Sequence, residues 1–370
     1  MKRGERLCLW HGHNMEALSY KCINCGGPLQ YDPQKLKFAC EYCRSEYTED
    51  ELIKHFGKLD EKLDEESKPE PEKTEGDDDY GEPALYVCQS CGAEVIAETN
   101  TAATFCVYCH NPIVLSNRLA GSFKPNLVIP FKISEKDAKQ KFYDFCGKKK
   151  FLPGDFLSDA QLDMMKGVYY PYWLVDSLKD GGVHATAEKR RTWREGDYEY
   201  EEKKIYKVKR FGKIDFKHFP HSALKAADDK KALKYVNPFE DEEARPFTMS
   251  YLSGFLAEKR DLERTDAQAD VDEELKHYSE KIFKESIQGY DSVRIDNLML
   301  KTLEESWQYA LMPVWIMTFK YKDKDYLYAM NGQTGKTYGE LPVSAVKLAI
   351  FGAIMLVVVF AIMLFLGGVL

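Results

Sequence analysis

Four Cys-x-x-Cys pairs constrain this chain more than any other feature, because they hold eight of its ten cysteines. Two cysteines separated by two residues can bind one metal ion together but are poorly placed to form a disulfide with each other. Residues 1–4, Met-Lys-Arg-Gly, lead into no apolar signal segment. Without a secretory signal a disulfide framework is not expected, so the pairs predict metal ligands.

The pairs form two sets that are offset from each other by 66 residues, and fourteen residues separate the two pairs within each set. Four thiolates donated from two turns make the closed tetrahedral site of structural zinc, with no open position for a catalytic water. We therefore expect two small β zinc ribbons, which fold around two structural Zn²⁺ ions. The predicted metal ligands are Cys22, Cys25, Cys40 and Cys43 in the first ribbon, and Cys88, Cys91, Cys106 and Cys109 in the second.

Two other uses of these pairs fit less well. Cys106 to His110 matches the Cys-x-x-Cys-His pattern of c-type haem attachment, but that reading needs export and leaves Cys88 and Cys91 unexplained. Redox chemistry at a Cys-x-x-Cys pair needs a thioredoxin-like βαβ context, which the surrounding sequence lacks. Of the two remaining cysteines, Cys8 fits a flexible N-terminal extension better than a metal site, and Cys146 fits a small buried hydrophobe.

Charge and apolar pattern divide the chain into five segments. An N-terminal extension and the first ribbon occupy residues 1–58, and the second ribbon occupies 84–118. Between them, residues 59–83 are acidic: from Asp60 to Glu82 there are twelve Asp or Glu and three Lys. Such a segment buries too little apolar surface to offset its ordering entropy, so we expect a disordered linker.

Residues 119–342 mix two periodicities and predict a mixed α+β domain with antiparallel strands. Helical spacing covers 134–147 and 270–288, and strand-like runs cover 198–209 and 310–328. Asn331-Gly332 predicts a two-residue hairpin turn.

Two segments of this domain also share a Pro-x-Trp-aliphatic core, at Pro171 to Leu174 and at Pro313 to Ile316. Internal duplication and chance both explain this similarity, and the sequence does not decide between them.

The C-terminal segment, 346–370, predicts one transmembrane helix. Residues 348–370 carry no charge, and as a helix they would be about 34 Å long, enough to cross a bilayer core. Lys347 precedes them. We expect a single-pass protein of the cell membrane with its N-terminal bulk in the cytoplasm, where thiolate ligands persist.

No catalytic motif is found. Gly335-Lys336-Thr337 resembles the end of a phosphate-binding loop, but Met330 stands where that loop needs glycine. The histidines of the α+β domain lack metal or triad spacing. We therefore expect no enzyme activity and no small-molecule substrate.

Charge argues against nucleic acid as the partner of the ribbons. Residues 21–44 carry a net charge of +2 and residues 84–118 carry −1, without the concentrated basic patch that phosphate binding needs. A basic segment at 184–218 carries +4. It fits the solvated face of antiparallel strands, and the sharper alternative is contact with anionic lipid headgroups.

Several motifs together resemble a bacterial family of membrane-anchored TFIIB-type zinc-ribbon proteins, whose members are also labelled primosomal-helicase-like. The helicase label reflects the cysteines alone, since the phosphate-binding loop is missing. Arg44 and His110 depart from the glycine that such ribbons commonly place after the last cysteine. The motifs are Asn-Thr-Ala-Ala-Thr-Phe-Cys-x-Tyr-Cys at 100–109 followed by Asn-Pro, Val-Ile-Pro-Phe at 128–131, Gly-Val-Tyr-x-Pro-x-Trp-Leu at 167–174, Leu-x-Pro-Val-Trp at 311–315 and Ala-Met-Asn-Gly-Gln-Thr-Gly-Lys at 329–336.

The resemblance implies association with SPFH-domain (flotillin-like) proteins and phage-shock protein A relatives in membrane stress responses. Together with the residues, it leads us to expect a non-enzymatic membrane adaptor whose ribbons bind a cytoplasmic protein. A membrane-tethered nucleic-acid-binding protein is the alternative, and an enzyme hosted by the α+β domain is third.

Overall fold

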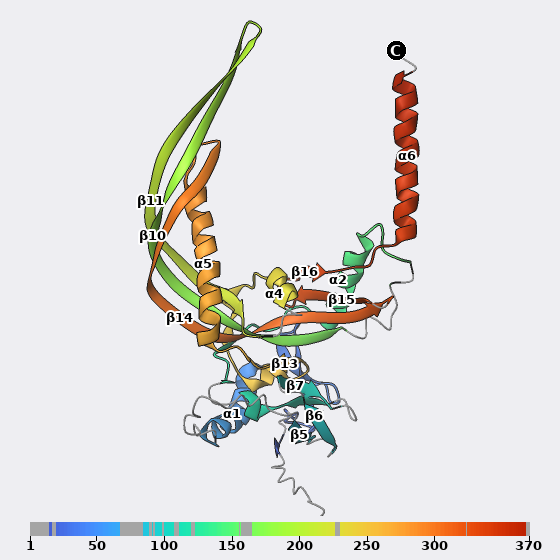
Figure 1. The fold of residues 1–370 in the computed structure, drawn as a ribbon. Helices are drawn as coiled ribbons and strands as arrows, with labels where there is room; N and C mark the ends of the chain where they lie inside the picture. Colours follow the sequence, from blue (N-terminus) through green and yellow to red (C-terminus); the bar gives the residue numbers. More distant parts are fainter. Residues whose placement is uncertain are drawn as a thin grey trace, which may run out of the picture. The chain divides into compact units, whose positions relative to one another are not determined.

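The structure is a computed structural model of the 370-residue chain. It describes residues 15–16, 20–66, 84–88, 91, 93–97, 100–106, 111–119, 123–154, 156, 165–225, 230–322 and 324–367. Within these ranges the fold is α+β, as predicted, with small cysteine-rich β units, a large mixed sheet and one apolar C-terminal helix (Figure 1).

The first cysteine set lies in a three-stranded antiparallel sheet of β2 (Leu29–Asp32), β3 (Lys37–Cys40) and β4 (Glu46–Tyr47). Helix α1 (Glu49–Glu66) follows directly. Thr48 and Glu51 form a capping box at its start: the Thr48 N–H donates to the Glu51 carboxylate (2.8 Å), and the Glu51 N–H donates to the Thr48 hydroxyl (3.4 Å).

The predicted linker 59–83 is therefore wrong at its N-terminal end, because α1 continues through residue 66. Leu52, Phe56, Leu59 and Leu63 recur at helical spacing. Acidic composition hid this pattern, while the capping box before it supplies a helix start signal. The rest of the linker lies outside the described residues.

The second cysteine set is shared between two sheets. Strand β5 (Ala84–Val87) pairs antiparallel with β6 (Glu94–Ala97) and parallel with β1 (Met15–Glu16). Strands β7 (Thr101–Phe105) and β8 (Pro112–Val114), which precede the short helix η1 (Ser116–Leu119), belong to the large sheet. The second ribbon is thus built into the α+β domain rather than standing alone as residues 84–118.

The large sheet has ten strands among the described residues. Its main path runs β12 (Arg245–Pro246), β9 (Leu127–Val128), β14 (Ser292–Tyr321), β10 (Lys166–Glu195), β13 (Leu256–Glu258), β7 and β8. Three further strands extend it: β11 (Tyr198–Ser222) pairs with β10, β15 (Lys324–Asn331) with β14, and β16 (Thr337–Gly339) with β15.

Two strands of 30 residues each, β10 and β14, contribute to both of the compact units into which the chain divides. One unit contains residues 1–170, 226–259 and 311–370, and the other contains 171–225 and 260–310. The predicted α+β domain at 119–342 is therefore not one unit, and the first unit also includes both cysteine sets.

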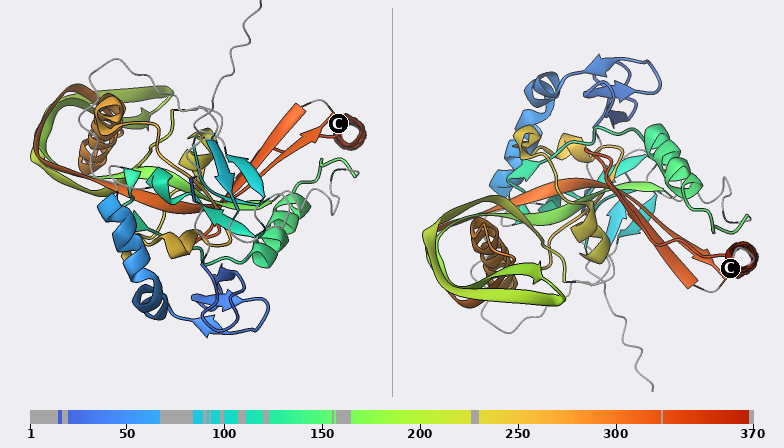
Figure 2. Two further views of the ribbon diagram at one scale, coloured as in Figure 1. Left: turned by 90° about the horizontal axis from the view of Figure 1, so that it is seen from below. Right: turned by 90° about the horizontal axis from the view of Figure 1, so that it is seen from above.

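In the second unit, helix α5 (Arg264–Ser286) packs against β10, β11 and β14. Figure 2 shows these strands curving around the helix. Phe283 and Ile287 meet an apolar strip that includes Val183, Ala185 and Val208. Odd-numbered residues of β10 and even-numbered residues of β11 face this core, as strand alternation requires.

The first unit also holds α2 (Glu135–Gly147), α4 (Lys230–Val236) and the short helices η3 (Asp241–Glu243) and η4 (Met249–Leu252). The helix predicted at 134–147 is confirmed, with Ser134 as its N-cap. The helix predicted at 270–288 is α5, which begins six residues earlier. The strand-like run at 310–328 is two strands, β14 and β15, with a turn after Tyr321.

The two Pro-x-Trp segments make equivalent contacts in their separate units. The indole N–H of Trp315 donates to the carbonyl of Ile133, one residue before the N-cap of α2, at 3.0 Å. The indole N–H of Trp173 donates to the carbonyl of Leu262, one residue before the N-cap of α5, also at 3.0 Å. This equivalence favours internal duplication over chance.

The predicted hairpin is confirmed, since β15 pairs antiparallel with β16, but the two-residue turn predicted at Asn331-Gly332 is wrong. Strand β15 ends at Asn331 and β16 begins at Thr337, so five residues connect them. The Gly335 N–H donates to the Asn331 carbonyl (3.0 Å), and Gly335 has a φ of +78°. The glycine that needs the left-handed conformation is therefore Gly335, not Gly332.

Helix α6 (Ala345–Gly367) confirms the predicted apolar C-terminal helix. Its segment Ala345–Met363 is long and apolar enough to cross a membrane, and none of it is buried within the protein. The exposed side chains include Ile354, Leu356 and Phe360. This is a candidate single span by length and composition.

Candidate metal centres

The first cysteine set forms a compact cluster of four thiols. All four sulfurs lie within 4.8 Å of one another, and Sγ–Sγ distances are 3.5 Å for Cys22–Cys43 and for Cys25–Cys40. A disulfide would need about 2.05 Å, whereas a tetrahedron of thiolates around an ion at about 2.3 Å places its sulfurs about 3.8 Å apart. The donor set therefore fits one metal ion.

Two tight turns aim the sulfurs at one point. In the first, the Gly26 N–H donates to the Cys22 carbonyl (2.8 Å), and Gly26 has a φ of +74°. In the second, the Arg44 N–H donates to the Cys40 carbonyl (2.9 Å), and Arg44 has a φ of +61°. Arg44 thus adopts the left-handed conformation that explains why glycine is common at its position in such ribbons.

Neighbouring polar groups favour the thiolate form, which is the form that binds metal, at Cys22 and Cys43. At Cys25 the backbone N–H of Gly27 lowers the pKa, but the neighbouring thiols outweigh it and raise the pKa to about 12. Burial opposes ionisation of Cys22, but hydrogen bonds from the Tyr47 hydroxyl (3.3 Å) and from backbone N–H groups outweigh it and lower its pKa. The hydroxyl and backbone N–H of Ser45 lower the pKa of Cys43 to about 6. The cysteine spacing alone did not predict that Tyr47 and Ser45 contact the thiols. Their position just after Cys43, the last cysteine of the set, is the sequence feature that could have indicated it.

The second set is also brought together. Cys88, Cys91 and Cys106 lie within 4.8 Å of one another, with 3.6 Å between the sulfurs of Cys91 and Cys106. Cys109, the predicted fourth ligand, lies outside the described residues. Cys88 and Cys106 are buried in an apolar cluster with Tyr86 and Ile113, among others. Three convergent thiols fit a second metal ion.

Of the two cysteines outside the sets, Cys146 lies among the described residues. Cys146 is buried on α2, and burial raises the pKa of its thiol to about 11, as expected for a small hydrophobe. Cys8 lies outside the described residues.

The first ribbon is docked onto its unit by hydrogen bonds and aromatic packing. The Ser253 hydroxyl donates to the Leu29 carbonyl, and the Tyr31 N–H donates to the Ser253 carbonyl (3.1 Å). The Tyr251 ring packs against Tyr31 and Phe38. The first ribbon is therefore held by its own unit and does not depend on the predicted linker at 59–83 for its position.

The tips of both turns of the first ribbon expose apolar side chains. Ile23, between Cys22 and Cys25, is 41% exposed, and Tyr42, between Cys40 and Cys43, is 74% exposed. The two tips belong to one cluster of cysteines, so this ribbon presents a small apolar surface.

Two basic residues of the first ribbon, Lys35 and Lys37, are engaged within it. Lys35 forms an ion pair with Glu46, and the Lys37 Nζ lies 3.7 Å from the same carboxylate. A carboxylate between two lysines reduces the positive potential that a phosphate would need.

The loop at residues 331–336 holds the segment after α4 in place through side-chain hydrogen bonds. The side-chain amide of Asn331 donates to the carbonyls of Val236 and Pro238 (both 3.0 Å). Its oxygen accepts from the N–H groups of Gln333 and Thr334 (both 2.9 Å). The loop thereby fixes the backbone after α4.

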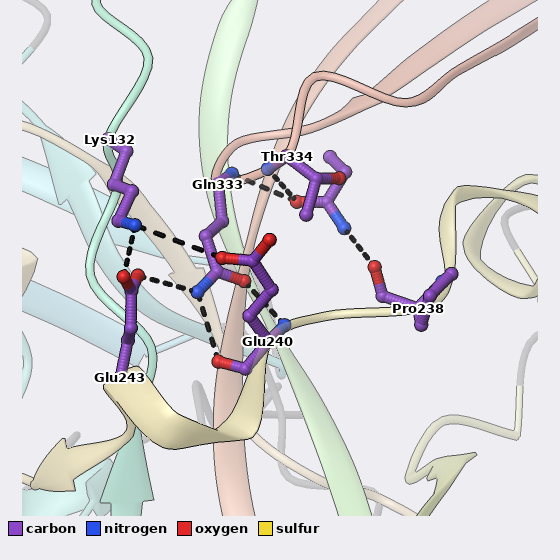
Figure 3. Close-up of polar contacts among 7 residues, drawn as sticks. Lys132, Pro238, Glu240, Glu243, Gln333 and Thr334 are labelled. Carbon is purple, nitrogen blue, oxygen red and sulfur yellow. Dashed lines mark hydrogen bonds and ion pairs between the residues drawn. The ribbon is translucent and has the colours of Figure 1, made fainter.

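The Gln333 side chain continues this network (Figure 3). It donates to the Glu243 carboxylate (2.8 Å) and to the Glu240 carbonyl (3.0 Å), and Glu243 also pairs with Lys132. Lys336, the residue that resembled a phosphate-binding lysine, donates to the carbonyl of Asn237. These side chains hold the fold together.

The basic segment at 184–218 lies in β10 and β11. Lys203 pairs with Glu188 (2.9 Å), and Lys207 with Asp296 (3.2 Å). Such pairing across antiparallel strands favours the solvated-face explanation over lipid contact for this segment.

These features define a class: an α+β protein with two cysteine clusters that fit metal ions and one candidate membrane span. No family model matches the chain, and no solved structure matches it. The chain is 30% identical over 332 residues to the uncharacterized protein YdjG of Bacillus subtilis (strain 168), which covers 90% of this chain and 92% of that protein. The chain belongs to the family of YdjG.

Proposed function

We propose that this chain is a non-enzymatic adaptor that α6 anchors in the cell membrane and whose first ribbon binds a cytoplasmic protein. The observation that carries the proposal is the exposed apolar pair Ile23 and Tyr42 at the tips of a rigid, docked ribbon. Exposed aromatic and aliphatic anchors on a fixed scaffold are typical of protein-binding sites.

The metal of both clusters is Zn²⁺ in this proposal. All the described ligands are thiolates, which suit zinc, and closed thiolate sites are structural. A cytoplasmic location of the residues before α6 is supported by the persistence of thiolate ligands in a reducing compartment and by Lys347 at the start of the span, which agrees with the positive-inside tendency.

The resemblance supplies the partner class: SPFH-domain proteins and relatives of phage-shock protein A, acting in the membrane stress response. The alternative, a membrane-tethered nucleic-acid-binding protein, has less support because Glu46 contacts both Lys35 and Lys37 and offsets part of their positive charge.

A crosslinking pulldown from native membranes tests the adaptor. The full chain should recover an SPFH-domain or phage-shock protein A-like protein after nuclease treatment, and the Ile23→Ala/Tyr42→Ala variant should lose it. Tyr198→Ala is the matched control, because Tyr198 is 72% exposed on β11 in the other unit. Equal recovery by both variants would reject the ribbon surface, and recovery of nucleic acid alone would favour the alternative.

A further inference from the structure

A second feature of the first unit lies at the start of α6. Residues 148–152 contact the beginning of this helix: the Ser344 N–H donates to the Phe151 carbonyl (2.7 Å), and the Lys347 ammonium donates to the Leu152 carbonyl (2.7 Å). The Phe151 ring meets the Phe351 ring edge-on at 5.3 Å between centroids. The segment after α2 is therefore fixed against the first turns of the candidate span.

A cavity of about 420 Å³ opens at this junction. Its apolar wall comes from Phe151, Leu152 and Leu341 together with the Pro342-Val343 segment. Its charged rim is Lys148, Lys149 and Lys150, which are all exposed, and none of the residues lining it is acidic. The cavity thus combines three consecutive lysines with an apolar floor, and the Lys149 ammonium also lies 5.1 Å from the centroid of the Phe145 ring.

A second cavity that shares the Pro342-Val343 segment has matching chemistry. This cavity, of about 400 Å³, is lined by Tyr321, Tyr326 and Lys322. Tyrosine and lysine at the end of a hydrophobic span are typical of the membrane–water interface. Both cavities near the start of α6 therefore suit the headgroup region of a bilayer.

We propose that the Lys148–Lys150 cavity binds an anionic phospholipid, with the headgroup phosphate at the three lysines and an acyl chain along the apolar wall. The occupant follows from two observations: the cavity reaches Val343, two residues before a helix that can span a membrane, and the charged residues that line it are all lysines. Basic pockets beside a span recognise anionic headgroups in this way. The inference rests on the proposed anchoring by α6.

The test uses the full-length protein in nanodiscs that contain equal amounts of phosphatidylglycerol and phosphatidylcholine. Native mass spectrometry then counts the lipids that stay bound after the protein is released. The wild type should retain phosphatidylglycerol over phosphatidylcholine by at least about tenfold, given three lysines beside one headgroup. The variant Lys148→Gln/Lys149→Gln/Lys150→Gln should lose this preference.

Two further variants separate the site from general electrostatics. Lys209→Gln/Lys213→Gln/Lys217→Gln makes the same charge change at exposed positions of β11 and should keep the preference. Leu341→Trp fills the cavity without changing charge and should reduce the bound lipid. An unchanged preference in the Lys148–Lys150 variant, or an equal loss in the β11 variant, would overturn the proposal.

The same experiment distinguishes this inference from the proposed function. A protein that enters nanodiscs but shows no lipid preference would contradict only the lipid site. A protein that does not enter nanodiscs would contradict the anchor and the lipid site together.

Discussion

At the residue scale, the first cysteine cluster combines buried and exposed ligands. Cys22 and Cys40 are buried, whereas Cys25 and Cys43 are exposed. The buried pair lies close to the ribbon sheet, since Cys40 ends β3 and Cys22 bonds back across its turn. The exposed pair lies next to Ile23 and Tyr42, so the metal would also fix the surface proposed to bind the partner.

Replacing one buried ligand should remove one metal. Cys40→Ser leaves three thiolates in the first cluster, so we expect the purified protein to contain one Zn²⁺ instead of two and the first ribbon to unfold. Elemental analysis of the purified full-length chain measures this. Cys146→Ser is the matched control, because Cys146 is buried outside both clusters, and it should keep both ions; equal metal content in both variants would contradict the assignment.

Glu243 should make a small, pH-dependent contribution to stability. Hydrogen bonds from Lys132 and Gln333 lower the pKa of its carboxyl in the folded chain. This contribution is therefore present above the ordinary glutamate pKa and is lost as the pH falls through the lowered folded value.

The variant Glu243→Gln measures that contribution. At neutral pH it should be less stable than the wild type by under about 1 kcal/mol, because the ion pair is partly exposed and solvent screens it. In acid the two proteins should converge. Denaturant midpoints measured across the pH range check this, and a difference that grows on acidification would contradict it.

At the element scale, local signals explain which predictions succeeded. Helix α2 was predictable because Ser134 caps an apolar helical repeat, and the cysteine clusters were predictable because each turn carries its own spacing. Strands β9 and β12 were not, because each has two residues and forms only through partners distant in sequence. The hairpin turn was misplaced because Asn331 uses its side chain to hold a segment nearly a hundred residues away.

The run at 198–209 lies in β11, as predicted, but the full length of the long strands escaped prediction for a related reason. From residue 189 to its end β10 is exposed on both faces, and so is most of β11. The side chains there alternate little between apolar and polar. Pairing with each other over 23 aligned positions makes them strands. The sequence therefore revealed the class of the fold but not the extent of this hairpin.

A buried lysine joins the three main elements of the second unit. Lys179 of β10 donates to Asp272 of α5 (3.0 Å) and to Thr302 of β14 (2.7 Å), and Glu305 of β14 lies 3.9 Å away. Lys179→Ala should destabilise the protein by about 2 kcal/mol, because it removes charge-assisted hydrogen bonds to the half-exposed Asp272 and to Thr302.

Denaturant unfolding of the full-length chain in detergent measures this loss. Lys301→Ala, at an exposed position of β14, is the control and should change stability by under about 0.5 kcal/mol. Similar losses in both variants would mean that Lys179 does not hold α5 to the strands.

At the scale of the whole molecule, the two units share a continuous backbone. The chain passes between them at four points, following residues 170, 225, 259 and 310. Two of these points lie inside β10 and β14. Neither unit is therefore a contiguous segment of sequence, and a truncation that keeps one unit intact would cut strands that belong to the other.

The last prediction concerns α6 as a membrane anchor, because the proposed function depends on this helix. Ile354 and Val357 are exposed near the middle of the apolar segment Ala345–Met363. Replacing both with lysine should oppose insertion by about 6 kcal/mol, from about 3 kcal/mol per charge at the centre of a span. Alkaline carbonate extraction of native membranes should then release Ile354→Lys/Val357→Lys but leave the wild type and the apolar control Ile354→Leu/Val357→Ile in the membrane. Release of the wild type would show that α6 does not span the bilayer, and the exposed apolar surface of the helix would then need a protein partner to cover it.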